Sequence, residues 1–273
     1  MLQIPIEKLE SVESVMNYTE DSDYRPAFYI DRPVSGIETS ARVSEKHTVP
    51  IYDIRTQMDD ASLDGNGFCF VRNSLPQLDF FDPDMVKTDY YPMCAEYVQR
   101  ATGAARVMAF DHNVRDKDLT DQAGVNFPVR FAHNDYTEKS GPQRVHDLMG
   151  DEASALLERR YLFINVWRPL RGPVLDTPLA VCDAASLDTQ DFIVTDLIYH
   201  DRTGEIFSFR FSKNHRWVFL RNMQADEILL LKCFDSATDG RARYTAHSAF
   251  RDPRAAADVP VRRSIEVRTI AFF

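Results

Sequence analysis

The second half of the chain is a succession of short apolar segments, and this pattern limits the fold more than any other feature. Eight segments follow one another between residues 161 and 273, separated by turn residues: YLFINVW, PLAVC, DFIVTDLIY, GEIFSFRF, RWVFL, EILLLKCF, RYTAHSAF and SIEVRTIAFF. Short β-rich runs at this spacing are typical of an antiparallel barrel or sandwich. We therefore expect a mainly β protein with flanking helices, and a jelly roll fits the number of strands.

Local signals refine this expectation. The clearest hairpin joins DFIVTDLIY to GEIFSFRF through residues 200–204. This loop ends in Gly204, at a position where the turn requires a left-handed backbone conformation that glycine adopts readily. Residues 124–135, GVNFPVRFAHND, read as a further strand. Apolar residues at helical spacing predict helices over residues 85–103 and 142–160, and Pro92 must lie near a kink or in a first turn.

The chain carries no internal repeat and no Gly/Ser-rich linker, so a single domain over residues 1–273 is the simplest organisation. Residues 1–84 are polar and poor in periodic signal, and we expect them to form an extension that wraps the core. Strand candidates within it are Ala27–Ile30 and Gly67–Arg72. This extension could also form a subunit contact in a homodimer.

Charge and composition exclude several classes of function. With 32 basic and 42 acidic residues the net charge is −10, and no dense basic cluster suggests a nucleic-acid partner. No apolar run approaches the roughly 18 residues of a membrane span. The start of the chain lacks the pattern of a signal peptide, so we expect a cytoplasmic protein. Its four cysteines form no CxxC pair and are predicted to be reduced and buried.

Three residues form a candidate metal site. His133 and Asp135 end an apolar segment. Because seven histidines and 42 acidic residues would give about one His-x-acid pair by chance, this pair needs support from another part of the chain. His247 lies far along the chain on the next-to-last predicted strand, between the small residues Thr245 and Ala249. Two histidines and one carboxylate can occupy one face of Fe(II) and leave positions for a cosubstrate and dioxygen. The alternatives are a helix-capping Asp135 and a hydrogen-bonded core His247.

Arg262 and Ser264 form a candidate anion site at the start of the last strand. Being two residues apart, they share one face, where a guanidinium and a hydroxyl can grip a carboxylate. The distal carboxylate of 2-oxoglutarate suits this pair. The alternative is a solvated basic edge, which the neighbouring Arg263, Arg254 and Arg251 would also explain.

Further residues are candidates for a substrate or cosubstrate pocket: Asn165, Trp167, Arg168, His215 and Trp217. Alternation along YLFINVWR places polar and aromatic residues on one side, which suits a cavity wall. Arg168 could reach a carboxylate of the cosubstrate, a substrate acid, or only solvent. His215 could replace His247 as the third metal ligand.

Five blocks of the sequence resemble a known family in their order and spacing: HNDYT, FINVWRPLRGPVLDTPLAVCD, NHRWVFLRNMQADEILLLKCFDS, TAHSAFRDP and VRRSIEVR. The resemblance is to the non-heme iron oxygenases that include the cephamycin methoxylase subunit and the asaB-type fungal hydroxylase/desaturases. It extends from about Met85 to the C-terminus and implies a double-stranded β-helix of the cupin-like jelly-roll type.

The resemblance also implies Fe(II) bound by His133, Asp135 and His247, and 2-oxoglutarate held by Arg262 with Ser264. The family usually has an acidic residue between these last two, where this chain has Arg263, so the anchoring role could shift to Arg263. The predicted function is oxidation of an unactivated C–H bond in a small-molecule secondary metabolite by hydroxylation, desaturation or oxidative cyclisation.

Two other functions fit the same residues. A metal-free barrel could use them to bind an acidic small molecule. A cupin-type metal hydrolase or isomerase would need a fourth protein ligand, for which His215 is the candidate.

Overall fold

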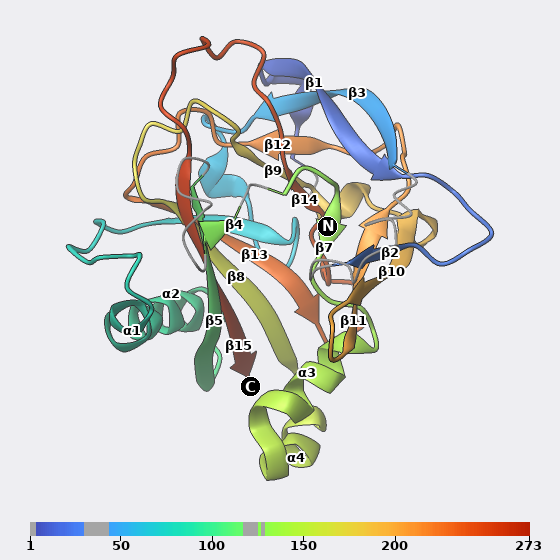
Figure 1. The fold of residues 1–273 in the computed structure, drawn as a ribbon, viewed down its shortest axis with the longest axis vertical. Coiled ribbons are helices and arrows are strands. Elements are labelled where there is room, and N and C mark those ends of the chain that lie inside the picture. The colour runs from blue at the N-terminus through green and yellow to red at the C-terminus, as the bar shows by residue number, and fades with distance from the viewer. Residues whose placement is uncertain (1–3, 30–43, 117–124, 127–128) are drawn as a thin grey trace.

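Two β-sheets face one another and enclose the main core of the protein (Figure 1). The computed structural model describes residues 4–29, 44–116, 125–126 and 129–273. The predicted mainly β fold is confirmed. All eight segments predicted between residues 161 and 273 contribute strands.

One sheet carries Ser264, a candidate for binding the cosubstrate, and Arg262 directly precedes the strand that contains it. Within the described residues it has six strands, in the order β4 (Phe68–Arg72), β13 (Glu227–Asp235), β8 (Tyr161–Pro169), β15 (Arg263–Phe272), β5 (Arg106–Asp116) and β6 (Val125–Asn126). Every residue of β8 is buried. Its odd-numbered residues, such as Phe163 and Trp167, pack between the sheets, whereas Ile164 and Val166 belong to a second core. This burial on both faces explains why β8 is a continuous apolar run.

The other sheet carries the two histidines of the candidate metal site. Its nine described strands are β1 (Ser11–Thr19), β3 (Ser44–Asp53), β12 (Trp217–Phe219), β9 (Leu179–Cys182), β14 (His247–Ala249), β7 (His133–Asn134), β11 (Thr203–Phe209), β10 (Phe192–Ile198) and β2 (Ala27–Tyr29). The described part of residues 1–84 thus adds strands to both sheets, and this part is more regular than the sequence indicated.

Helices flank the sheets as predicted. The helix expected over residues 85–103 comprises α1 (Pro83–Met85), a π-helical turn (Val86–Tyr90) and α2 (Tyr91–Thr102), with Pro92 in the first turn of α2. It contacts β5, β15 and β8. The second helix is broken into α3 (Ser140–Met149) and α4 (Ala153–Leu157) by a 3-10 turn. Every helix in the described ranges is too short or too polar to cross a membrane.

Two local predictions were wrong. The β10–β11 hairpin exists, but its turn closes with the Tyr199 N–H donating to the Arg202 carbonyl, and Gly204 pairs with Leu197 inside the ladder. Residues 124–135 do not form one strand either: β6 and β7 belong to different sheets. Residues 124, 127 and 128 lie outside the described ranges.

Candidate metal centre

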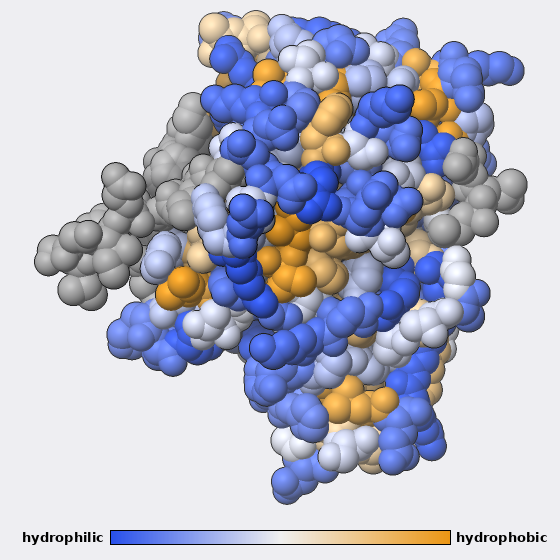
Figure 2. All heavy atoms as spheres, turned by 90° about the vertical axis from the view of Figure 1, so that its right-hand side faces the viewer, coloured by the Kyte–Doolittle hydropathy of each residue, from blue (hydrophilic) through white to orange (hydrophobic). Residues whose placement is uncertain are grey.

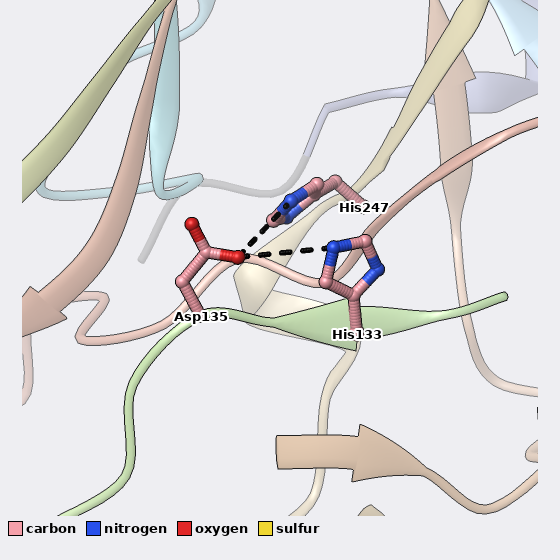
Figure 3. A group of neighbouring side chains, drawn as sticks. All are labelled: His133, Asp135 and His247. Atoms are coloured by element: carbon pink, nitrogen blue, oxygen red, sulfur yellow. Dashed lines mark ion pairs between the residues drawn. The ribbon is translucent and has the colours of Figure 1, made fainter. Parts of the chain in front are cut away.

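His133 and His247 are direct neighbours on adjacent antiparallel strands. The register of β7 and β14 pairs the two residues, so their side chains leave the same face of the sheet. Their ring centroids are 4.2 Å apart. Asp135 follows two residues after His133, and its Oδ1 lies 3.8 Å from Nε2 of His133 and 3.9 Å from Nε2 of His247 (Figure 3). One ligand atom from each residue lies within 4.8 Å of the others.

The other nitrogen of each histidine fixes the orientation of its ring. Nδ1 of His133 lies 2.9 Å from the Phe131 carbonyl oxygen, and Nδ1 of His247 lies 3.1 Å from that of Thr245. A carbonyl oxygen can only accept, so each Nδ1 carries the proton and donates it. The Nε2 lone pairs are therefore free to bind a cation beside Asp135.

Burial sets the charge of this cluster. The exposed fractions of the His133, Asp135 and His247 side chains are only 12%, 14% and 4%. Burial, reinforced by His247, lowers the pKa of His133 to about 3, so this ring is neutral at pH 7. Burial alone would raise the pKa of Asp135, but the charge of Arg268 holds it below its usual value. A carboxylate beside neutral imidazole is a suitable donor set for a divalent metal.

The segment before His247 is held by Gly67 and Asn134. Thr245 donates its hydroxyl to the Gly67 carbonyl (2.6 Å) and its N–H to Oδ1 of Asn134 (3.3 Å). Nδ2 of Asn134 donates to the carbonyl oxygens of Tyr136 (2.8 Å) and Cys233 (2.9 Å). Asn134 therefore ties together β13, the turn after β7 and the approach to β14. Our sequence analysis missed this role, although Asn134 lies inside the motif that drew attention to the site.

Asp135 also makes contacts across to the six-stranded sheet. Its Oδ2 accepts from Nδ2 of Asn165 at 2.8 Å and from Nε of Arg268 at 3.3 Å. Asn165 was a predicted pocket residue, and the structure brings it to the site. Arg268 was missed, although it ends the VRRSIEVR block, because its spacing alone does not relate it to a metal ligand.

Arg262 and Ser264 provide buried donors that lack acceptors. Arg262 is 4% exposed and Ser264 is fully buried. Nη1 of Arg262 donates to the Thr177 carbonyl at 2.6 Å, but Nε of Arg262 and Oγ of Ser264 have no hydrogen-bond partner among the described residues. Burial, together with Arg115, lowers the pKa of Arg262 to about 9. Such a desolvated guanidinium is costly unless an anion joins it.

The surroundings of Arg262 distinguish it from Arg263. The Trp167 ring, a predicted pocket residue, lies 5.5 Å from the guanidinium carbon of Arg262. Arg263 instead forms an ion pair with Asp116 on β5, at 2.5 Å. Arg115, which the sequence analysis did not select, stands opposite Ser264 in the β5–β15 register.

The structure places Arg168 outside the pocket. Its Nε donates to the Ala225 carbonyl at 3.1 Å and its Nη2 to that of Asn73 at 2.9 Å. Side chains alternate along a strand, so Arg168 leaves the face opposite to Trp167. The predicted contact with a cosubstrate or substrate acid was therefore wrong.

His215 and Trp217 also lie away from the metal site. Nδ1 of His215 is 3.1 Å from the Tyr18 hydroxyl, and its Nε2 is 3.0 Å from Oδ2 of Asp191. Trp217 donates its indole N–H to the same Tyr18 hydroxyl at 2.6 Å. Strand register puts Val218 on the face that carries the metal-site histidines, which leaves Trp217 on the other face. His215 is therefore neither a replacement iron ligand nor a fourth ligand.

A cavity of about 260 Å³ reaches the site from the surface. Asp135 and Arg268 line it, together with residues of α3 and of the β10–β11 hairpin. Figure 2 views the molecule from the side of β2, β10 and β11 and shows apolar side chains near the middle of this face, framed by hydrophilic ones. The cavity therefore gives a small molecule access to Asp135, one of the three metal-site residues.

Comparisons with known proteins agree with this geometry. A family model described as an oxidoreductase/YMDC permease-like domain matches residues 16–272. The Fe(II)/2-oxoglutarate-dependent dioxygenase nvfI of Aspergillus novofumigatus (strain IBT 16806) is 34% identical over 233 residues, which cover 83% of each chain. The chain belongs to this family of dioxygenases. The predicted oxidoreductase class is thereby confirmed.

A second relative and a solved structure of NvfI agree with this assignment. The hydroxylase/desaturase efuI of Hormonema carpetanum is 33% identical over 249 residues, or 82% of this chain and 83% of that protein. A solved structure of the iron and alpha-ketoglutarate-dependent endoperoxidase NvfI superposes with a TM-score of 0.88 at 30% identity, covering 96% of this chain and 98% of the other. The predicted double-stranded β-helix is thus confirmed for this oxygenase.

Proposed function

We propose that this protein is an Fe(II)- and 2-oxoglutarate-dependent oxygenase that acts on an unactivated C–H bond of a small-molecule secondary metabolite. The observation that carries the proposal is the convergence of His133, Asp135 and His247, whose ligand atoms lie within 4.8 Å of one another. Ser264 lies on the same face of β15 as Arg268, which contacts Asp135 from the opposite sheet. The function of similar proteins, which include a dioxygenase and a hydroxylase/desaturase, supports it.

The donor set of the cluster fits Fe(II). His133, Asp135 and His247 would hold the metal through two imidazole nitrogens and one carboxylate oxygen, which is the facial arrangement of non-heme iron oxygenases. Bound iron would supply the activation of dioxygen, with 2-oxoglutarate as the reducing cosubstrate. The protein's own contribution is to orient the reactants and to keep water from them.

The buried donors of Arg262 and Ser264 fit the distal carboxylate of 2-oxoglutarate. An anion there would accept from Nε of Arg262 and from Oγ of Ser264, which otherwise lack partners among the described residues. It would also compensate the desolvated guanidinium charge. The ion pair between Arg263 and Asp116 supports Arg262 as the anchor.

The cavity between α3 and the β10–β11 hairpin would admit the substrate. Tyr136 and Ile206 offer apolar surface beside Asp135. Sequestering a substrate against such surface orients the target carbon and excludes water. Hydroxylation, desaturation and cyclisation would then differ in where the substrate's reacting carbon lies.

Finer aspects of the proposal concern relatives and cellular context. We place the chain near the asaB-type enzymes and the cephamycin methoxylase subunit, and the five shared sequence blocks support this.

We treat residues 1–273 as one domain, because β1, β3 and β4 complete its two sheets. Four free cysteines suit the cytoplasm. A homodimer stays a prediction from the sequence.

Anaerobic titration of the full chain with Fe(II) and 2-oxoglutarate tests the proposal. We expect a weak visible charge-transfer band, which His133→Ala and Asp135→Ala should abolish. Arg262→Met should weaken 2-oxoglutarate binding by about 10-fold or more, since a hydrogen bond to a charged group contributes about 1.5–3 kcal/mol. The matched control, Arg263→Met, should retain wild-type affinity.

Three results would contradict the proposal. Loss of 2-oxoglutarate binding in Arg263→Met but not in Arg262→Met would assign the anchor to Arg263. Absence of metal uptake would favour a metal-free binding barrel. Turnover of a substrate without dioxygen would favour a metal hydrolase or isomerase.

A further inference from the structure

The two carboxylate oxygens of Asp135 have different surroundings. Oδ1 faces Nε2 of both His133 and His247. Oδ2 points away from the rings (Figure 3), toward Nδ2 of Asn165 and Nε of Arg268. The two oxygens therefore have separate tasks in this structure.

We propose that Asn165 and Arg268 are positioning residues that hold Oδ2 of Asp135, so that this ligand binds the metal through Oδ1 alone. The inference rests on the proposed function. Each carboxylate oxygen has about two lone pairs, and the two N–H donors occupy those of Oδ2. Chelation of the metal by both oxygens would break these hydrogen bonds. A single-oxygen ligand leaves one more coordination position for the cosubstrate or dioxygen.

The donors act from the opposite sheet. Asn165 on β8 and Arg268 on β15 are directly paired in the ladder of the six-stranded sheet, whereas Asp135 follows β7 of the nine-stranded sheet. Their side chains reach across the barrel to one oxygen. The contact therefore holds the carboxylate in a fixed orientation from both sides of the barrel.

Arg268 is itself held in place by acidic partners. Its Nη1 lies 2.6 Å from Oδ2 of Asp111, which is its ladder partner on β5, and its Nη2 lies 3.8 Å from Oε1 of Glu266. The guanidinium cannot swing away from Asp135 without leaving these contacts. A ligand-supporting residue that is fixed by its own partners is the arrangement by which outer contacts orient metal ligands.

Asn165 offers the cleaner test of the two residues. The described lining of the 260 Å³ cavity includes Arg268 and Asp111 but not Asn165. A change at Arg268 could therefore alter substrate access, whereas a change at Asn165 acts on Asp135. Both residues should be substituted, and metal binding should be measured without substrate.

The experiment is anaerobic calorimetric titration of the full chain with Co(II), combined with the visible spectrum of the Co(II) complex. Asn165→Ala and Arg268→Met should weaken Co(II) binding by about 10- to 100-fold, the usual effect of removing an outer contact to a metal ligand. The spectrum should also change, because its intensity reports coordination number. Arg268→Lys keeps one charged donor and should recover part of the affinity.

Arg263→Met is the matched control, because Arg263 also pairs with an acidic residue of β5 but lies outside the site. It should bind Co(II) as the wild type does. Wild-type affinity and spectrum in both Asn165→Ala and Arg268→Met, with normal binding by the wild type, would overturn this inference alone. Failure of the wild-type protein to bind Co(II) would overturn the proposed function together with it.

Discussion

Gly67 supports His247 at a distance, and its replacement by alanine should damage both the fold and the metal site. Gly67 has φ +84°, and an added Cβ would lie 2.2 Å from Oγ1 of Thr245. That hydroxyl donates to the Gly67 carbonyl, and the Thr245 carbonyl accepts from Nδ1 of His247. The new methyl group must therefore displace the residue that orients the His247 ring.

The expected loss can be worked out from two contributions. A left-handed conformation costs a non-glycine residue about 1–2 kcal/mol. Displacing Thr245 breaks a buried hydrogen bond and leaves its groups unsatisfied, which costs about 1–3 kcal/mol. Gly67→Ala should thus lower the free energy of unfolding by about 2–5 kcal/mol.

Gly103 provides a matched control. It has φ +72° at the end of α2, and nothing lies within 4 Å of an added Cβ. Gly103→Ala should therefore lose only the backbone contribution of about 1–2 kcal/mol. The difference between the two variants isolates the collision with Thr245.

Urea unfolding and Co(II) titration would measure the two effects. The double variant Gly67→Ala/Thr245→Ala should recover stability relative to the sum of the single variants, because the 2.2 Å contact with Oγ1 is then gone. The nearest remaining atoms are the Cβ of Ala184 at 3.3 Å and the Cβ of residue 245 at 3.4 Å. Gly67→Ala should also weaken Co(II) binding, whereas Gly103→Ala should not. Equal losses of stability in Gly67→Ala and Gly103→Ala would refute the reasoning.

Other predictions concern polar groups outside the metal site. Tyr18→Phe removes the hydroxyl bonded to His215 and should cost about 1–3 kcal/mol in urea unfolding without changing Co(II) affinity. Arg168→Met should cost a similar amount and leave 2-oxoglutarate affinity unchanged, because Arg168 donates to the carbonyls of Ala225 and Asn73 on the face of β8 opposite to Trp167. Burial alone would raise the pKa of the Asp235 carboxyl, but Arg160 and Lys232 hold it below its usual value of 3.8. The ionised carboxylate therefore stabilises the fold above that pH, and this stabilisation is lost on acidification. Asp235→Asn should therefore cost about 3 kcal/mol at pH 7, and its difference from wild type should shrink as the pH falls below about 4.

Each of these has a clear contrary result. Weakened metal binding in Tyr18→Phe would return His215 to the candidate site. Weakened 2-oxoglutarate binding in Arg168→Met would restore the original expectation for Arg168. A destabilisation of Asp235→Asn that is the same from pH 7 to pH 3 would show that its charge does not stabilise the fold.

Many features of this protein follow from local patterns that need no tertiary information. Short apolar runs bounded by turn residues specify strands because each must bury its side chains, and all eight runs after residue 160 became strands. The metal-site candidates were selected in the same way, from a His-x-Asp spacing and one distant histidine. The Arg262–Ser264 pair needed only the two-residue period of a strand.

The faces of the strands were only partly assigned from the sequence. The polar and aromatic side of β8 indicated a cavity wall, and Asn165 and Trp167 lie at the site. Because β8 is buried on both faces, the sequence could not show that Arg168, on the other face, packs in the outer core. The sequence likewise did not show whether Trp217 faces the cavity or packs on the outer side of its sheet. The partners of Asp135 were equally hidden, since Asn165 and Arg268 reach it from another sheet. A strand's sequence encodes its own alternation, whereas the packing of the two sheets determines which side chains meet between them.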